Sequence, residues 1–351
     1  MLPSVKELRI TLEGPYKIRA PYTNTILHTG KAIHNERIIP LEEGLRLGKG
    51  KYSLFGIIIQ PEAGNGLTIE GITYPGNMFI VRKEDMQLKA INIVDIEDYI
   101  KGVLPQEAYS SWPQETLKAQ AVAARSFAYY SILNSSSKSY DVSSGVTSQV
   151  YGGKSVWQPS TNKAVDSTRG EALVFNDSNL LAGYYHACCG GHTANIKDVW
   201  GLDIKPLSGR PSEFCQDTPY YSWKEKISLD AISERFRKRN IDIGSILDVY
   251  VDKKDESGRV LVMGFITDKG EFRITGHFFR HLLGTDVLKS TRIILESEDR
   301  YLILQGYGWG HGVGLCQWGA KSMAERGFTY KQILDFFYPG SRVERVDPDG
   351  A

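Results

Sequence analysis

A single alanine-rich stretch limits how this chain can pack. Ser111 offers a side-chain oxygen to cap a helix, Pro113 suits a first turn, and Gln114 follows three positions after the cap. This pattern predicts a helix from Glu115 to about Leu133. Its small residues lie on several faces, which lets other elements approach the backbone from more than one side, so we expect a central helix. These residues are Ala119, Ala121, Ala123, Ala124 and Ala128.

The segment before this helix has a different pattern. Residues 7–12 alternate between polar and apolar side chains, and residues 57–59 and 78–81 are short apolar runs near Gly, Pro or Asn. Short runs of this kind are typical of strands. We therefore expect residues 1–94 to form a β-rich N-terminal part.

The second half of the chain mixes short helices and strands. Residues 229–239 have a helical pattern, and residues 246–251 and 260–266 are strand-like. Near the end, Thr329 and Gln332 cap a helix that stops before Pro339. We predict an α+β fold with a mixed α/β catalytic core around the alanine-rich helix. The expected parts are 1–94 (β-rich N-terminal part), 95–222 (core catalytic region), 223–298 (an inserted smaller α/β unit) and 299–351 (a Gly-rich C-terminal segment that completes the core).

Charge and hydropathy exclude two classes of partner. The 351 residues include 42 Lys and Arg against 41 Asp and Glu, so the chain lacks the positive field that holds a polyphosphate, and no nucleic acid partner is expected. No apolar run approaches the ~18 residues that span a bilayer, so no transmembrane segment is expected. Residues 1–4 lack the basic start of a secretory signal, and the compartment must be inferred from function.

Glu107 is the first candidate for a catalytic group. It lies in the largely apolar segment 103–109, four residues before the predicted cap and near Trp112. Removing a carboxyl from water raises its pKa, which would let Glu107 donate a proton near neutral pH as a general acid. The alternative is an ordinary surface glutamate in a loop before the helix.

Residues 306–314 hold five glycines together with Trp309 and His311. Glycine lets the backbone approach a ligand closely, and an indole ring can stack on the apolar face of a sugar. The segment is therefore a candidate binding wall. The alternative is a tight structural turn packed under the last helices. A nucleophilic pair of His311 and Cys316 is a weaker hypothesis.

Cysteine and histidine side chains are concentrated in residues 186–192. Zinc prefers thiolate and imidazole ligands, and Cys189, His192 and Cys215 would supply them if the Gly-Gly turn folds the first two together. A disulfide between Cys189 and Cys215, with Cys188 buried as a small apolar residue, is the rival interpretation. The sequence leaves both open, so zinc is a candidate cofactor.

Three further polar groups are candidates for substrate contacts. Gln149 and Tyr151 lie close together before a Gly-Gly pair, and Gln317 follows the glycine-rich run. Like Arg125 in the alanine-rich helix, such groups more often make a satisfied structural hydrogen bond than bind a ligand.

Taken together, these motifs resemble one family. They are similar, and in the same order, to stage II sporulation protein D and its amidase-enhancer relatives, over about residues 5–345. The similar segments are residues 99–107, 115–126, 149–153, 186–193 and 310–320.

The resemblance implies a lytic transglycosylase of the cell envelope, periplasmic or extracellular. Such an enzyme cuts peptidoglycan glycan strands between N-acetylmuramic acid and N-acetylglucosamine and leaves a 1,6-anhydro end. Glu107 matches the catalytic acid of the family. One carboxyl suffices and no cofactor is required, because the C6 hydroxyl of the sugar is tethered beside the anomeric carbon and replaces water as the nucleophile.

Two other functions stay open. The second is that of the amidase-enhancer relatives, which stimulate a cell-wall amidase; the chain would then bind glycan without cutting it. The third is a zinc hydrolase centred on residues 186–192.

For the lytic transglycosylase we predict an open groove where the alanine-rich helix meets the Gly-rich C-terminal segment. The predicted substrate-binding residues around Glu107 are Gln149, Tyr151, His186, His311 and Gln317.

Overall fold

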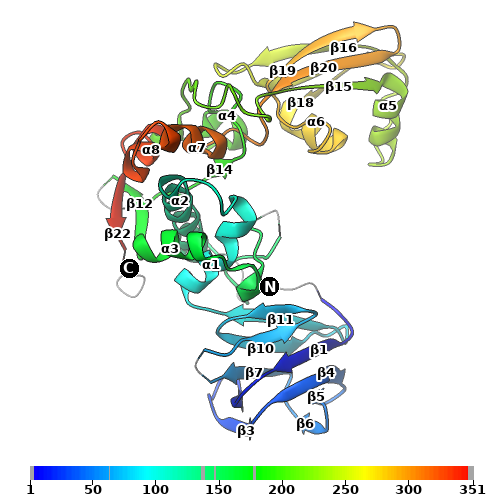
Figure 1. Cartoon of the computed structure of the whole chain (residues 1–351). Coiled ribbons are helices and arrows are strands. Elements are labelled where there is room, and N and C mark those ends of the chain that lie inside the picture. Colours follow the sequence, from blue (N-terminus) through cyan, green and yellow to red (C-terminus); the bar gives the residue numbers. More distant parts are fainter. Residues whose placement is uncertain (1–3, 63, 136–138, 146–147, 177–178, 347–351) are drawn as a thin grey trace. The chain divides into compact units, whose positions relative to one another are not determined.

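The chain divides into two compact units (Figure 1). The first comprises Met1–Ala172 and Glu344–Ala351, and the second comprises Leu173–Val343. The chain contains both helices and several separate antiparallel sheets, and the predicted α+β class is confirmed. Within the described residues, no helix is both long enough and apolar enough to cross a bilayer. The residues that the computed structural model describes are 4–62, 64–135, 139–145, 148–176 and 179–346.

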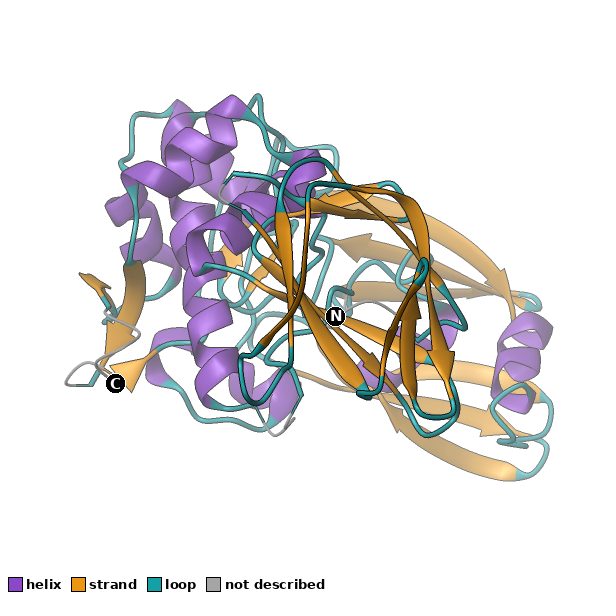
Figure 2. Cartoon of the chain, turned by 90° about the horizontal axis from the view of Figure 1, so that it is seen from below, coloured by secondary structure: helices purple, strands orange, loops and turns teal. Residues whose placement is uncertain are grey.

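The first unit begins with two antiparallel sheets, which account for the predicted β-rich part. The strand orders are β6-β5-β4-β1-β8-β9 and β11-β10-β7-β2-β3. Figure 2 shows strands of both sheets around a shared interior. The strands are β1 (Leu8–Leu12), β2 (Tyr16–Arg19), β3 (Ile26–Gly30), β4 (Ile33–Leu41), β5 (Gly44–Leu47), β6 (Gly50–Tyr52), β7 (Gly56–Pro61), β8 (Leu67–Ile69), β9 (Ile72–Tyr74), β10 (Asn77–Arg82) and β11 (Leu88–Ile93).

Alternation along these strands buries one face of each sheet. On β1, Leu8, Ile10 and Leu12 are buried, whereas the residues between them are more exposed. In the other sheet, Ile80 of β10 lies opposite Ile57 of β7, and both are fully buried. Each such side chain contributes about 1.5–3 kcal/mol when it leaves water, so the alternating pattern fixes which face of the sheet turns inward.

Three α-helices follow the sheets: α1 (Ile96–Glu107), α2 (Gln114–Leu133) and α3 (Pro159–Ser167). The short 3-10 helix η1 (Gly153–Val156) precedes α3. Helix α2 is the predicted central helix, because 12 of its 20 residues are buried and it contacts both α1 and α3. The predicted cap is wrong: the N-cap residue is Pro113, which makes no side-chain hydrogen bond, and not Ser111.

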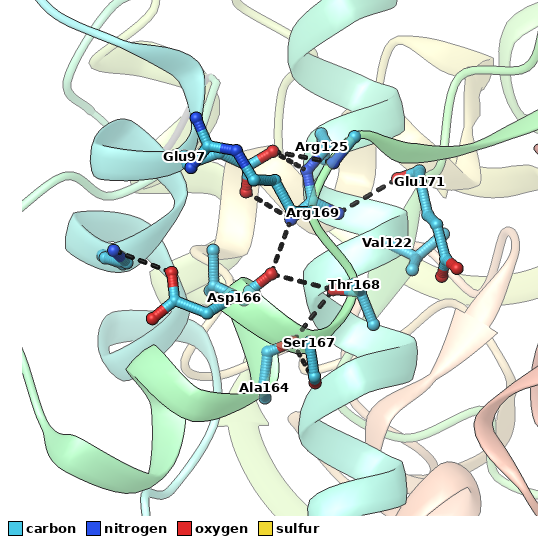
Figure 3. A network of polar contacts seen from close by, with 12 residues as sticks. Glu97, Val122, Arg125, Ala164, Asp166, Ser167, Thr168, Arg169 and Glu171 are labelled. Atoms are coloured by element: carbon cyan, nitrogen blue, oxygen red, sulfur yellow. Dashed lines mark hydrogen bonds and ion pairs between the residues drawn. The ribbon is translucent and has the colours of Figure 1, made fainter. Parts of the chain in front are cut away.

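A buried ion pair joins α1 to α2 (Figure 3). Arg125 donates to the Glu97 carboxylate at 3.0 and 2.6 Å, and the two side chains are 0% and 3% exposed. Arg125 also donates to the carbonyls of Glu171 (3.0 Å) and Val165 (3.3 Å), while the Gly170 amide donates to Glu97 at 2.9 Å. Because buried charges are stable only when paired and hydrogen-bonded, this network has a structural role, as expected for Arg125.

The second unit brings distant parts of the chain together. The chain enters it within β12 (Glu171–Phe175), which pairs with β13 (Asn179–Leu180), and β14 (Tyr185–His186) pairs in parallel with β21 (Leu315–Cys316). This pairing places His186 beside Cys316. The predicted capping box of Thr329 is confirmed at the last helix. The remaining elements of this region are α4 (Ile196–Trp200), η2 (Lys205–Leu207), α7 (Gln317–Glu325), α8 (Tyr330–Phe337) and β22 (Arg342–Arg345).

An α/β lobe occupies residues 222–307 of the second unit. Its two antiparallel sheets have the orders β15-β20-β19 and β16-β17-β18. Phe236, Phe265 and Phe279 are fully buried in its core. The ring centroid of Phe265 lies 5.5 Å from that of Phe236 and 5.7 Å from that of Phe279. The predicted helix and strands of this region are confirmed. The elements are β15 (Ser222–Ser228), α5 (Leu229–Arg237), β16 (Ile246–Lys254), β17 (Val260–Thr267), β18 (Gly270–Thr275), α6 (Gly276–Leu283), β19 (Ile293–Glu298) and β20 (Tyr301–Tyr307).

Candidate functional site

Glu107 is the last residue of α1 and is half-buried. The helix begins at Ile96, after Asp95 accepts a hydrogen bond from the Glu97 amide at 2.8 Å. Pro105 lies inside its last turn, and the helix ends where Ala108 takes an extended conformation. Glu107 therefore stands on a helix terminus and not in the loop that the sequence suggested as the alternative.

The segment 148–152 lies along α1 and reaches the Glu107 carboxylate. The Val150 amide donates to Glu107 Oε1 at 3.4 Å, and the Gly152 amide donates to the Gly102 carbonyl at 3.0 Å. A backbone N–H that points at a carboxylate stabilises its charged form and fixes its position. These bonds hold the carboxylate against the segment that contains Gln149 and Tyr151.

Gln149 is 1% exposed and makes hydrogen bonds inside the first unit. Its side-chain oxygen accepts from Tyr99 at 3.2 Å, and its nitrogen donates to the Ala124 carbonyl at 3.2 Å. Burial raises the pKa of Tyr99, and the nearby Glu107 carboxylate raises it further, so Tyr99 is a neutral hydrogen-bond donor. Gln149 thereby ties α2 to the Glu107 region.

Tyr151 packs against the same helices. Its hydroxyl donates to Asn92 Oδ1 at 2.8 Å, and its ring centroid lies 5.0 Å from that of Tyr99. A Cβ at Gly102 would lie 2.4 Å from the Tyr151 ring, so the glycine permits this approach. The roles of Gln149 and Tyr151 in substrate binding stay predictions. Their contacts show that both support the backbone beside Glu107.

Tyr109 is a residue that the sequence analysis did not single out. It follows Glu107 by two positions, is 57% exposed, and its ring centroid lies 5.4 Å from that of the buried Trp112. An exposed aromatic ring supported by a second ring offers a firm apolar face. An aromatic residue two positions after a candidate acid was the signal that could have identified it.

Glu97, an acidic residue of the first turn of α1, cannot act together with Glu107. Glu97 lies ten residues earlier on the helix, and a rise of 1.5 Å per residue separates the two backbones by about 15 Å. Glu97 is also committed to Arg125. Glycosidases that use two carboxyl groups need them about 5–9.5 Å apart, so this pair is excluded from such a mechanism.

His186 and His311 lie together in the second unit, with ring centroids 5.6 Å apart. His186 Nδ1 lies 3.1 Å from the Val313 carbonyl, and His311 Nδ1 accepts from the Val313 amide at 3.0 Å. Burial lowers the pKa of both residues. For His311 the pKa falls to about 3, and the positive charge of Arg280 is the second cause after burial. Both imidazoles are therefore neutral at physiological pH.

The glycine-rich run packs tightly against this pair. Gly310 has φ 115°, and a Cβ there would lie 2.7 Å from His186 Cβ. Gly312 has φ 88°, and a Cβ there would lie 2.5 Å from the Arg259 guanidinium. The glycines are thus needed for backbone conformation and close packing, as the structural alternative for this segment proposed.

The four cysteines are buried free thiols of the second unit. The sulfur atoms of Cys188, Cys215 and Cys316 lie within 4.8 Å of one another, and Cys189 Sγ lies 3.3 Å from Cys215 Sγ. We call these four residues the cysteine cluster. His192 makes a different contact, because its Nδ1 lies 2.7 Å from the Thr193 carbonyl. The sequence analysis named Cys189 and Cys215 but did not connect them with the other two.

Each predicted groove residue belongs to one of the two units. Glu107, Gln149 and Tyr151 belong to the first, and His186 and His311 belong to the second. Gln317 also belongs to the second unit, where it begins α7 and is 7% exposed. The contacts above show that Glu107 lies against the segment of Gln149 and Tyr151, and that His186 lies beside His311. The groove that would join the two sets, and the place of Gln317 in it, stay predictions.

Comparison with known proteins gives two family matches. A family described as stage II sporulation protein matches residues 84–175, which include Glu107 and the segment 148–152. A domain family of unknown function matches residues 206–314, which include the inserted lobe.

Curated relatives extend the similarity over most of the chain. An uncharacterized protein of Brachyspira hyodysenteriae is 34% identical over 340 residues, which cover 96% of this chain and 89% of that protein. The amidase enhancer of Bacillus subtilis is 28% identical over 85% of this chain and 49% of its own length. Stage II sporulation protein D of Bacillus subtilis is 26% identical over 74% of this chain and 77% of its own length.

Proposed function

Because the chain belongs to the stage II sporulation protein D family, we propose that it acts on the bacterial cell wall, as a lytic transglycosylase that cuts the glycan strands of peptidoglycan. The observation that carries this proposal is the position of Glu107. Its carboxyl group stands at the end of a helix, held by the Val150 amide, beside an exposed aromatic ring.

The proposed reaction needs one acid and no water. Glu107 donates its proton to the oxygen between N-acetylmuramic acid and N-acetylglucosamine as the bond to the anomeric carbon breaks. The C6 hydroxyl of the same muramic acid attacks that carbon, and the Glu107 carboxylate takes the hydroxyl proton. The products are an N-acetylglucosamine chain end and a 1,6-anhydro muramic acid end, and the enzyme is restored.

The surroundings of Glu107 suit a group that must both donate and accept a proton. The Val150 N–H, at 3.4 Å, favours the carboxylate. The negative end of the helix dipole acts in the other direction and favours the neutral acid.

Tyr109 supplies an apolar surface next to the acid. Its ring is 57% exposed and is backed by Trp112. Aromatic rings bind the apolar faces of flat ligands, and one face of a pyranose ring is apolar. We assign Tyr109 to the sugar subsite beside the cleaved bond, where it would position the glycan for protonation by Glu107.

Digestion of purified peptidoglycan tests the proposal. Wild type should produce 1,6-anhydro ends that mass spectrometry detects, whereas Glu107→Gln should still bind the insoluble wall but produce no such ends. The amide keeps the size and hydrogen-bonding capacity of the side chain but cannot donate a carboxyl proton. If Glu107→Gln released anhydro ends at the wild-type rate, the assignment of the acid would be wrong.

The second candidate function is a glycan-binding enhancer of a cell-wall amidase. The similarity over 85% of this chain to a protein named amidase enhancer favours it. This function predicts that wild type and Glu107→Gln bind the wall equally, release no anhydro ends, and increase amidase activity to the same degree. The same digestion, repeated with an added amidase, distinguishes the two functions.

A further inference from the structure

We propose that the cysteine cluster, Cys188, Cys189, Cys215 and Cys316, is a structural site for one tetrahedral, thiolate-bound metal ion of the zinc class. The site lies wholly in the second unit and contains no residue of the proposed acid site. It is therefore independent of the proposed function, and either can fail without the other.

The sulfur positions suit one ion. Four sulfurs around zinc, each about 2.3 Å from the metal, lie about 3.8 Å from one another. In the cluster, three sulfurs lie within 4.8 Å of one another, and Cys189 Sγ lies 3.3 Å from Cys215 Sγ. The Cys189–Cys215 spacing is about 0.5 Å shorter than this value, and the upper limit for the other three sulfurs exceeds it by about 1 Å. A disulfide, by contrast, requires sulfurs about 2.05 Å apart.

Backbone amides already point at one of the sulfurs. The Cys189 amide lies 3.2 Å from Cys316 Sγ, and the Gly319 amide lies 3.3 Å from the same atom. Cys316 is the N-cap of α7, so the positive end of the helix dipole acts on its sulfur as well. N–H donors and helix N-termini stabilise thiolates, the form in which cysteine binds metal ions.

A buried cation lies next to the cluster. Arg259 is 2% exposed, and its guanidinium donates to the carbonyls of Cys189 (2.9 Å) and His192 (2.8 Å) and to Ser257 Oγ (2.8 Å). These three acceptors carry no charge, and the Asp255 carboxylate, which accepts from the Arg259 backbone amide at 2.8 Å, supplies one negative charge nearby. One divalent ion with four thiolates has a net charge of two negatives, which Arg259 would offset in part.

On binding, the metal ion replaces the thiol protons, which leave to solvent, and no electron is transferred. Because the four sulfurs complete a tetrahedron, no position stays open for a water molecule. The site is therefore structural and differs from the zinc hydrolase that the sequence left open.

The metal ion would cross-link the two ends of the α/β lobe. Cys215 precedes β15, and Cys316 follows β20, so a single ion would join the two ends of the lobe to residues 188–189. Cross-links between positions so far apart in sequence remove much of the freedom of the unfolded chain. We therefore expect metal binding to stabilise the second unit.

Metal analysis of the purified full chain tests this proposal. The chain is produced in zinc-supplemented medium, dialysed without chelator, and measured by elemental mass spectrometry. We expect one zinc ion per chain. Replacement by cobalt should give the absorption bands of tetrahedral cobalt–thiolate coordination. Peptide mapping under non-reducing conditions should find no Cys189–Cys215 disulfide.

Four variants separate this site from its rivals. Cys188→Ser and Cys316→Ser should each reduce the bound zinc several-fold, while His192→Asn and Glu107→Gln should keep it. A loss of zinc in His192→Asn, with zinc retained in Cys188→Ser and Cys316→Ser, would overturn the proposal in favour of the mixed histidine and cysteine set. Wild type that holds a disulfide, or holds four thiols and no metal, would also overturn it. If the serine variants fail to fold, the metal content and cobalt spectrum of wild type decide.

Discussion

The backbone amide of Val150 donates to the carboxylate of Glu107 at 3.4 Å, although 43 residues separate them in sequence. This bond connects the end of α1 with the segment that follows the long central helix. A second hydrogen bond joins the same two segments, because the buried Tyr99 of α1 donates to the buried Gln149. The candidate acid therefore depends on a scaffold built from three separate parts of the first unit.

Loss of the Glu107 carboxyl should reduce the cleavage rate. Removing a positioned general acid costs about 10²–10⁴-fold, and we expect Glu107→Gln to lose anhydro-end formation by a factor in this range. Initial rates on soluble glycan strands provide the measurement. Glu13→Gln, at an exposed position directly after β1 in the same unit, is the matched control and should keep the wild-type rate. Equal losses in both variants would point to a general effect of charge.

Removal of the Tyr109 ring should weaken substrate binding. Aromatic contacts are worth about 0.5–1.5 kcal/mol beyond their burial, which corresponds to a roughly 2–12-fold increase in KM for Tyr109→Ala. Tyr109→Phe keeps the ring and should remain near wild type. Steady-state kinetics on glycan strands would check both. A wild-type KM in the alanine variant would remove Tyr109 from the sugar subsite.

Breaking the buried ion pair should destabilise the first unit. Arg125→Met leaves the Glu97 carboxylate without its partner, and such changes cost about 3–5 kcal/mol in the free energy of unfolding. The double variant Arg125→Met with Glu97→Gln removes both charges and should recover part of the loss. Urea unfolding of wild type, both single variants and the double variant provides the measurement. If the double variant lost the sum of both single effects, the two charges would not be coupled.

His311 should make stability depend on pH. Burial is the main cause, and the positive charge of Arg280 the second, that lower its pKa from 6.5 to about 3. Between these values the unfolded chain binds a proton that the folded chain does not, so the free energy of unfolding falls as the pH is lowered from about 6.5 to 3. The charged and titratable groups around His311 are Arg259, Arg280, His277, His186, Asp198 and Asp255.

The variant His311→Asn tests this pH dependence. It removes the titrating group and should flatten the profile by up to ~1.4 kcal/mol per pH unit in that window. Urea unfolding at several pH values measures the pH dependence of the free energy of unfolding of the second unit. The control is His28→Asn, in an exposed strand of the first unit. Parallel profiles for wild type and His311→Asn would show that other groups cause the dependence.

Local patterns predicted the elements whose signals lie within a few residues. The alanine positions of α2, the alternation in β1 and the Thr329 capping box each reflect backbone geometry that neighbouring residues decide. Helix α1 was missed because Gly102 and Pro105 are both unfavourable within helices. Packing of Tyr151 over Gly102 explains the glycine, and this contact depends on a residue almost fifty positions away.

The sites were less predictable for the same reason. Glu107 was identified from its motif, but its bond to Val150 depends on the path of the chain after α2. Cys316 meets Cys189 across 127 positions, through the parallel pairing of β14 with β21. Sequence spacing suggested His192 as a neighbour instead, because it lies close along the chain. Tertiary pairing, which no local pattern encodes, decides the membership of the cluster.

Digestion of peptidoglycan in ¹⁸O-labelled water tests the single-acid mechanism most directly. If the C6 hydroxyl of the sugar is the nucleophile, the new muramic acid ends carry no label and weigh one water molecule less than hydrolysed ends. We expect this product from wild type and none of it from Glu107→Gln. Muramic acid ends that incorporate ¹⁸O would show that water attacks the anomeric carbon, and would contradict the mechanism.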